Sequence, residues 1–121
     1  MRAQAHEETE HAMRLYKHLV DRGGRVELDT IQCPKKDWKS HVEVFEEAYA
    51  HEQKVTAMIH KLVSIAEAEK DRAAASMLQW FVDEQVEEEA STSEVAENIR
   101  RMGKSTGALV HYDRQLGKRK A

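Results

Sequence analysis

The sequence has little of what disulfide-stabilised, strand-rich or membrane-spanning proteins require. Its 121 residues include one cysteine, one proline and five glycines, and only 6% are aromatic. The single Cys33 excludes an internal disulfide, which suits a reducing compartment. No apolar run reaches the roughly 20 residues that cross a bilayer, and the first residues do not begin a signal peptide. We therefore expect a cytoplasmic protein with no membrane partner.

The sequence also lacks a large excess of one sign of charge: 34% of the residues are charged, but the formal net charge is only −3. A balance this mild gives no reason to expect nucleic acid as a partner. The one basic cluster is Lys118-Arg119-Lys120. Three charges supply little affinity for phosphates, and no base-reading element accompanies them, so we expect a frayed, solvated end.

Helix-favouring residues fill the long segments between the one proline and the five glycines, and alternation of β-branched residues is nearly absent. The sequence therefore predicts an all-α fold in one domain over residues 1–121. We expect helices at about residues 2–22, 38–68, 71–103 and 105–116. Pro34 lies in an unpatterned segment, 25–37, which is long enough to run the length of a helix. The helix after that segment is expected to run parallel to the first, and a two- or three-residue turn makes the next pair antiparallel.

The expected inward stripes of the helices contain polar residues. The stripe of the first helix is Ala5, Glu8, Ala12, Leu15, Tyr16 and Leu19. That of the second is Phe45, Ala48, Glu52, Val55, Ile59, Leu62 and Ala66, and that of the third is Leu78, Phe81, Val82, Gln85, Glu88, Thr92, Val95, Ile99 and Met102. A buried carboxylate costs several kcal/mol unless something positive meets it. A metal ion is the candidate for this positive partner of the buried carboxylates.

Counting from the tight turn places these polar residues at one level. Glu52 lies 16 positions before residue 68, whereas Gln85 and Glu88 lie 14 and 17 positions after Asp71. On antiparallel helices all three fall roughly 24 Å from the turn. The sequence therefore predicts that Glu52 meets Gln85 and Glu88.

The first helix contains an E-x-x-H motif, Glu8 and His11, whose i, i+3 spacing places a carboxylate and an imidazole on one face. Taken alone, such a pair is often plain helix surface. Together with single inward carboxylates from other helices, it matches the ligand pattern of di-metal carboxylate bundles. Hard oxygen donors with one imidazole suit Fe(II) or Mn(II) and, less well, Zn(II).

The sequence resembles the non-haem ferritins of bacteria and archaea. The resemblance rests on residues 5–13 (AHEETEHAM), 49–52 (YAHE), 78–80 (LQW), 84–89 (EQVEEE) and 103–105 (GKS). It implies that Glu8 bridges two irons, that His11 binds the first, and that Glu52, Gln85 and Glu88 frame the second. It also implies a third, more exposed iron site toward a cage interior, formed by Glu7, Glu84 and Glu87.

The resemblance further implies a ferritin-like up-down helical bundle with one long crossover loop. Its activity would be that of a ferroxidase, which oxidises Fe(II) with O2 or H2O2 and stores a ferric mineral in a homo-oligomeric cage, of 24 subunits in that family. We expect no haem, because Thr9 stands where bacterioferritins place a haem-ligating methionine. Two alternatives stay open: a di-metal peroxidase or oxidase without mineral storage, and a shell subunit with a defective centre.

The start of the sequence departs from the family pattern. The chain begins inside what would be the second helix, so a first helix with a further Glu ligand and a nearby Tyr is missing. We therefore expect an N-terminally truncated bundle of three long helices and one short one. Leu15, Leu19, Val55, Ile59 and Val95 should then be exposed, and the chain should not form a stable monomer.

Overall fold

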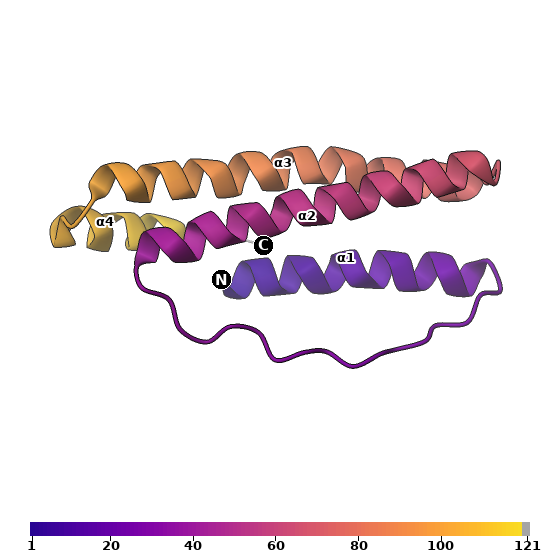
Figure 1. Ribbon diagram of the computed structural model, residues 1–121, viewed down its shortest axis with the longest axis horizontal. Coiled ribbons are helices and arrows are strands. Elements are labelled where there is room, and N and C mark those ends of the chain that lie inside the picture. Colours follow the sequence, from indigo (N-terminus) through magenta and orange to yellow (C-terminus); the bar gives the residue numbers. More distant parts are fainter. Residues whose placement is uncertain (120–121) are drawn as a thin grey trace. The chain divides into compact units, whose positions relative to one another are not determined.

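The regular structure of the protein is entirely helical in the part that the computed structural model describes, residues 1–119 (Figure 1). The helices are α1 (Arg2–Asp21), α2 (His41–Ala68), α3 (Arg72–Met102) and α4 (Thr106–Leu116). No strand occurs in those 119 residues. The all-α prediction is thus confirmed. α2 begins at His41 instead of residue 38 because the Ser40 hydroxyl accepts a hydrogen bond from the Glu43 N–H at 3.1 Å and caps the helix.

Contacts divide the chain into two compact units. One contains α1 and α4, and the other, residues 36–105, contains α2 and α3. The expectation of a single domain stays a prediction. Each unit holds part of the set of residues that the sequence singles out as metal ligands.

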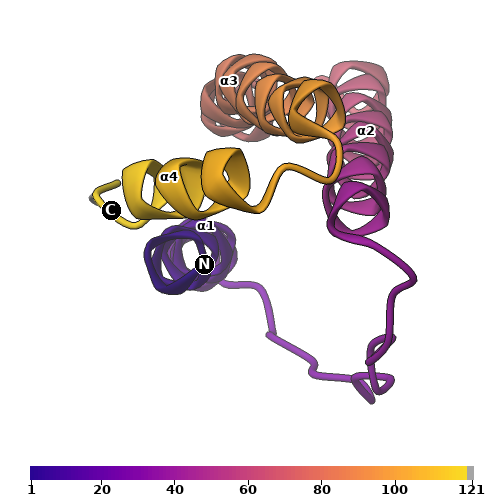
Figure 2. The same cartoon turned by 90° about the vertical axis from the view of Figure 1, so that its left-hand side faces the viewer.

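The second unit is an antiparallel pair of long helices, which lie side by side in the end-on view of Figure 2 and are joined by a tight turn that Figure 1 shows. The Asp71 N–H donates to the carbonyl of Ala66 at 2.8 Å, and the Lys70 N–H donates to that of Glu67 at 3.1 Å. This bonding pattern is a Schellman motif, which ends α2. The Asp71 carboxylate then accepts from the Ala74 N–H at 3.0 Å and caps α3, as predicted.

The far part of the same pair is joined by an ion pair. Arg100 of α3 donates a hydrogen bond to the Glu46 carboxylate of α2. That hydrogen bond and the negative charge of Glu46 raise the pKa of the Arg100 guanidinium. The contact is exposed, so it contributes little to stability.

The core of the pair is a narrow seam of apolar side chains. Its buried members are Ile59, Ala66, Leu78, Phe81, Ala96 and Ile99. Phe81 packs edge-on against the half-buried Trp80, with ring centroids 4.9 Å apart. The predicted stripes are therefore right for Ile59 and Ala66 on α2 and for Leu78, Phe81 and Ile99 on α3.

The same stripes are wrong or incomplete at several positions. Leu62 is 42% exposed, and the half-buried Val63 takes the inner position, because the seam on α2 advances by four residues from Ile59. Ala96 is likewise buried where Val95 was expected, and Val95 is half-buried. The other predicted stripe members that are only half-buried are Phe45, Ala48, Val55, Val82, Thr92 and Met102.

The first unit holds α1 and the much shorter α4. α1 ends at Asp21, in agreement with the stop signal predicted at Gly23-Gly24: φ of Gly23 is +75°, and the Gly24 N–H donates to the carbonyl of Leu19 at 2.8 Å. Its expected inward residues Ala5, Ala12, Leu15, Tyr16 and Leu19 are exposed. The stripe of α1 is therefore uncovered in the described chain, as the sequence analysis expected for Leu15 and Leu19.

Three of the predicted exposures need correction, because Ile59 is buried and Val55 and Val95 are half-buried. Leu15 and Leu19 are 37% and 41% exposed, as expected, but Ile59 is 6% exposed. Ile59 is buried because it lies in the seam with α3. Residues 24–38 form no helix or strand, in agreement with the unpatterned segment, and no helix within the described residues is long and apolar enough to cross a membrane.

The basic end of the chain is exposed as expected for a solvated tail, and it also makes one ion pair. Arg119, after α4, lies 3.3 Å from a carboxylate oxygen of Glu7 on α1. The exposure of Arg119 agrees with the expectation of a solvated end, and its charge also has an acidic partner within the same unit. Lys118 is exposed, and Lys120 lies outside the described residues.

Candidate metal centre

A buried polar cluster interrupts the seam between α2 and α3 where the sequence predicts it. Glu52, Gln85 and Glu88 are 9%, 4% and 4% exposed. Gln85 Nε2 lies 3.2 Å from Oε2 of Glu52, so the two helices meet at the predicted level. Glu88 follows Gln85 by one turn on the same face of α3. Two carboxylates and one amide, all hard oxygen donors, thus occupy positions where apolar residues would otherwise lie.

Gln85 is held by three acceptors from α2. Besides the Glu52 carboxylate, Nε2 lies 3.2 Å from the backbone carbonyl oxygen of Glu52 and 3.1 Å from Oγ1 of Thr56. Thr56 in turn donates its hydroxyl hydrogen to that same carbonyl at 3.0 Å. Thr56 is the member of the cluster that the sequence analysis missed. The available signal was a threonine four residues after Glu52, where a helix places it on the same face.

The Glu52 carboxylate has no cation within ion-pair distance among residues 1–119, and its one side-chain hydrogen-bond partner there is the neutral amide of Gln85. An ionised carboxylate that is largely removed from water is costly without a compensating positive charge. The cluster therefore has the chemistry of a cation site.

The E-x-x-H pair lies on α1, in the other unit. His11 Nδ1 is 3.4 Å from Oε2 of Glu8, which confirms that the i, i+3 spacing brings the two side chains together. The His11 side chain is 14% exposed and that of Glu8 is 50% exposed. A carboxylate and an imidazole at this spacing are able to bind one ion jointly, which is the reading that the sequence suggested.

The three residues expected at a third site are less uniform. The Glu7 side chain is 22% exposed and contacts Arg119. Glu84 is half-buried and Glu87 is exposed, and the two lie three residues apart on α3. Because Glu7 belongs to the first unit, only Glu84 and Glu87 lie together in one unit, and their joint role with Glu7 stays a prediction.

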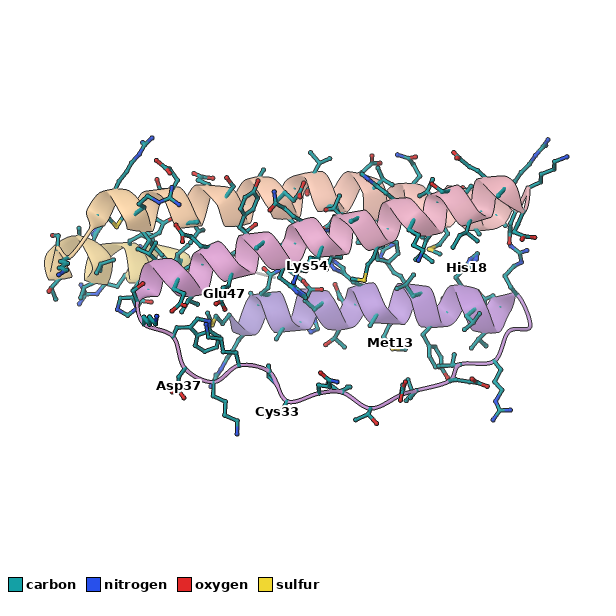
Figure 3. All side chains as sticks on the ribbon, viewed as in Figure 1. Met13, His18, Cys33, Asp37, Glu47 and Lys54 are labelled. Atoms are coloured by element: carbon teal, nitrogen blue, oxygen red, sulfur yellow. The ribbon has the colours of Figure 1, made fainter. Side chains whose placement is uncertain are left out.

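Cys33 contributes a contact of a different kind. It lies on the segment between α1 and α2 (Figure 3), is exposed, and its Sγ is 3.6 Å from the carbonyl oxygen of Pro34. The contact is with backbone, so nothing at this thiol resembles a metal site. The ligands offered by the chain are thus oxygen and imidazole donors, in one set on α1 and another on α2 and α3.

The known proteins that this chain matches are ferritins or contain a ferritin-like domain. The family model described as a ferritin-like domain matches residues 1–102. Bacterial non-heme ferritins from Staphylococcus aureus (strain MRSA252) and Staphylococcus haemolyticus (strain JCSC1435) are 40% and 39% identical over 116 residues, which are 96% of this chain and 70% of each relative.

Solved structures agree with the curated relatives. An open-pore ferritin from the archaeon Archaeoglobus fulgidus superposes with a TM-score of 0.97 at 44% identity, covering 99% of this chain and 74% of that one. Chlorobium tepidum ferritin gives a TM-score of 0.82 at 36% identity, covering 97% of this chain and 72% of that one.

Proposed function

Because the chain belongs to the ferritin family, we propose that it oxidises Fe(II) with O2 or H2O2 and stores the ferric product as a mineral inside a homo-oligomeric cage. The observation that carries the proposal is the buried cluster of Glu52, Gln85 and Glu88 in the seam between α2 and α3. Apolar residues would serve a purely structural seam better, since buried charge is costly. We place this activity in the cytoplasm.

In the proposed centre, Glu8 and His11 of α1 join Glu52, Gln85 and Glu88 to hold two Fe(II) ions. Glu8 bridges the ions, His11 binds the first, and the three residues from α2 and α3 frame the second. Glu7, Glu84 and Glu87 are proposed to hold a third ion. No haem is required, because each of these groups binds iron directly.

The chemistry divides between substrate and protein. Two Fe(II) ions each give up one electron, and together these two electrons reduce one O2 to H2O2 with two protons taken from solvent. The carboxylates of Glu52 and Glu88 supply negative charge that stabilises the more highly charged Fe(III) product. The neutral amide of Gln85 contributes an oxygen donor without adding a further repulsive charge beside Glu52.

Isosteric removal of charge tests the centre. We expect Glu52→Gln and Glu88→Gln each to slow the appearance of ferric product by about tenfold or more, because each removes a negatively charged ligand. Glu94→Gln, at an exposed position of the same helix as Glu88, is the control and should leave the rate unchanged. Wild-type rates in both buried variants would contradict the proposal.

Mineral storage needs a separate measurement, because a di-metal oxidase would share the same ligands. Iron should continue to be taken up far beyond the two or three ions per chain that the proposed sites hold. Uptake that stops at about two ions per chain would support the oxidase alternative. Absence of any iron oxidation in an intact assembly would support a shell subunit with a defective centre.

A further inference from the structure

The amide nitrogen of Gln85 has more acceptors around it than hydrogens to give. Nε2 carries two N–H groups and faces three acceptors: the Glu52 backbone carbonyl, the Glu52 carboxylate and the Thr56 hydroxyl. The single hydroxyl hydrogen of Thr56 is already donated to the Glu52 carbonyl at 3.0 Å. Thr56 therefore accepts from Gln85, and one of the three acceptors is always in excess.

This arrangement fixes which way the amide points. If the amide were flipped, its oxygen would face two oxygens that only accept and a hydroxyl whose hydrogen is already used. The repulsion among these lone pairs excludes the flipped state. Each hydrogen bond of the Gln85 side chain in the described chain is made by Nε2. Oε1, on the other branch of the amide, keeps its lone pairs for a further partner.

We infer that Thr56 is a positioning residue that lets the Glu52 carboxylate exchange its hydrogen bond with Gln85 for a metal ion. The inference rests on the proposed function, in which Glu52 and Gln85 are ligands of the same ion. When Oε2 of Glu52 turns to the ion, one N–H of Gln85 loses its acceptor. Thr56 Oγ1 takes that N–H while the Glu52 carbonyl keeps the other, so no buried donor is orphaned.

A second threonine on α3 shows what is particular to Thr56. Thr92 donates to the backbone carbonyl of Glu88 at 2.7 Å, the same local bond that Thr56 makes to Glu52. In the described chain its hydroxyl contacts only carbonyls of its own helix, those of Glu88 and Glu89. Thr92 is thus a matched control that has the local bond without the amide contact.

The test uses the full chain with Co(II), a redox-stable probe whose visible absorption reports binding and ligand geometry. Thr56→Val keeps the side-chain shape and removes the acceptor. We expect it to weaken Co(II) binding by about tenfold or more, because binding then leaves a buried N–H without a partner. Thr56→Ser keeps the hydroxyl and should retain wild-type affinity. Thr92→Val should also bind Co(II) as the wild type does.

Thermal unfolding without metal separates this role from a structural one. In metal-free Thr56→Val, the Glu52 carbonyl and carboxylate still satisfy both N–H groups of Gln85. Its unfolding midpoint should therefore match that of Thr92→Val. A lowered midpoint combined with wild-type Co(II) affinity would show that Thr56 is merely structural.

The outcomes distinguish this inference from the proposed function. If Thr56→Val binds Co(II) with wild-type affinity while Glu52→Gln does not, the role of Thr56 is overturned and the proposed centre stands. If the wild type shows no saturable Co(II) binding, or binding that Glu52→Gln leaves unchanged, both are overturned.

Discussion

The neutrality of the Gln85 side chain matters to the stability of the metal-free protein. Its amide nitrogen lies 3.2 Å from a carboxylate oxygen of Glu52, and both side chains are buried. An amide satisfies this carboxylate, whereas a second carboxylate at the same place would repel it. The choice between two nearly isosteric side chains therefore decides whether the seam tolerates being empty of metal.

We expect Gln85→Glu to unfold at a lower temperature than the wild type when metal is removed, and to become less stable as the pH rises from 5 to 8. At the lower pH one of the two carboxyls is protonated and donates to the other, and at the higher pH that proton must leave. Saturating Co(II) should restore much of the loss. Thermal scans at both pH values, with and without Co(II), measure this. A variant whose midpoint is unchanged by pH would contradict the expectation.

Some of this cluster is predictable from sequence and some is not. Helical periodicity places Glu52, Gln85 and Glu88 on inward faces, and counting from the turn at Asp71 sets their level, because rise per residue is nearly constant. The contact between Thr56 and Gln85 escapes such reasoning. It depends on the rotamer and approach of a partner helix, which a one-dimensional pattern does not contain.

At the scale of helices, α1, α2 and α3 are each followed by a residue with positive φ, which is glycine after two of them and lysine after the third. α1 and α3 end with Gly23 and Gly103, whose φ values are +75° and +55°. α2 ends with Lys70 in the same left-handed region, at φ +55°. A side chain in this region costs about 1 kcal/mol that glycine avoids.

We therefore expect Lys70→Gly to raise the free energy of unfolding by about 1 kcal/mol, since it relieves the backbone without touching the Schellman hydrogen bonds. Thermal or urea unfolding measures the gain. Lys70→Ala, which keeps a β-carbon, should stay close to wild type and controls for the loss of the lysine charge. Destabilisation by glycine would show that the lysine side chain itself stabilises the turn.

The link between α1 and the end of the chain should be weak. Arg119 and Glu7 lie 3.3 Å apart, and the arginine side chain is 44% exposed. Exposed ion pairs contribute at most about 1 kcal/mol. Arg119→Gln should therefore lower the free energy of unfolding by less than about 1 kcal/mol, with the difference vanishing in high salt. Urea titrations at low and high ionic strength measure this, and a larger, salt-insensitive loss would contradict it.

Sequence periodicity does not predict which apolar residues of a helix are buried where that depends on the neighbouring helix. Leu62 and Val63 are both apolar, and periodicity alone does not say which of the two enters the seam with α3. For α1, the spacing of Leu15, Tyr16 and Leu19 correctly marks an apolar face, yet the face is exposed in the described chain. Amphipathicity indicates which side of a helix needs cover but not what supplies it.

The whole molecule exposes much apolar surface for its size. Exposed large side chains include Met13, Tyr16, Leu19 and Val20 on α1 and Met58, Leu62 and Ile65 on α2. Surfaces of this kind usually mark contacts with other chains. They agree with the proposal of a homo-oligomer.

We expect the chain to associate at micromolar concentration, with a mass by light scattering well above the 13.9 kDa of one chain. The double variant Leu62→Glu and Ile65→Glu should reduce that mass, because it places two charges in a surface that association would bury. Lys54→Glu, on an exposed position of the same helix, is the control. A sharply unfolding, concentration-independent monomer of the wild type would contradict the expectation.

The capped turn between α2 and α3 has a consequence for any redesign of this chain. Because Asp71 fixes where α3 starts, the level of each residue on α2 and α3 is set by the number of residues between it and the turn. One extra residue between Asp71 and Gln85 would swing the amide about 100° around its axis and 1.5 Å along it, away from Glu52. Exposed residues along this stretch can be exchanged without displacing Gln85, but a change in its length displaces it.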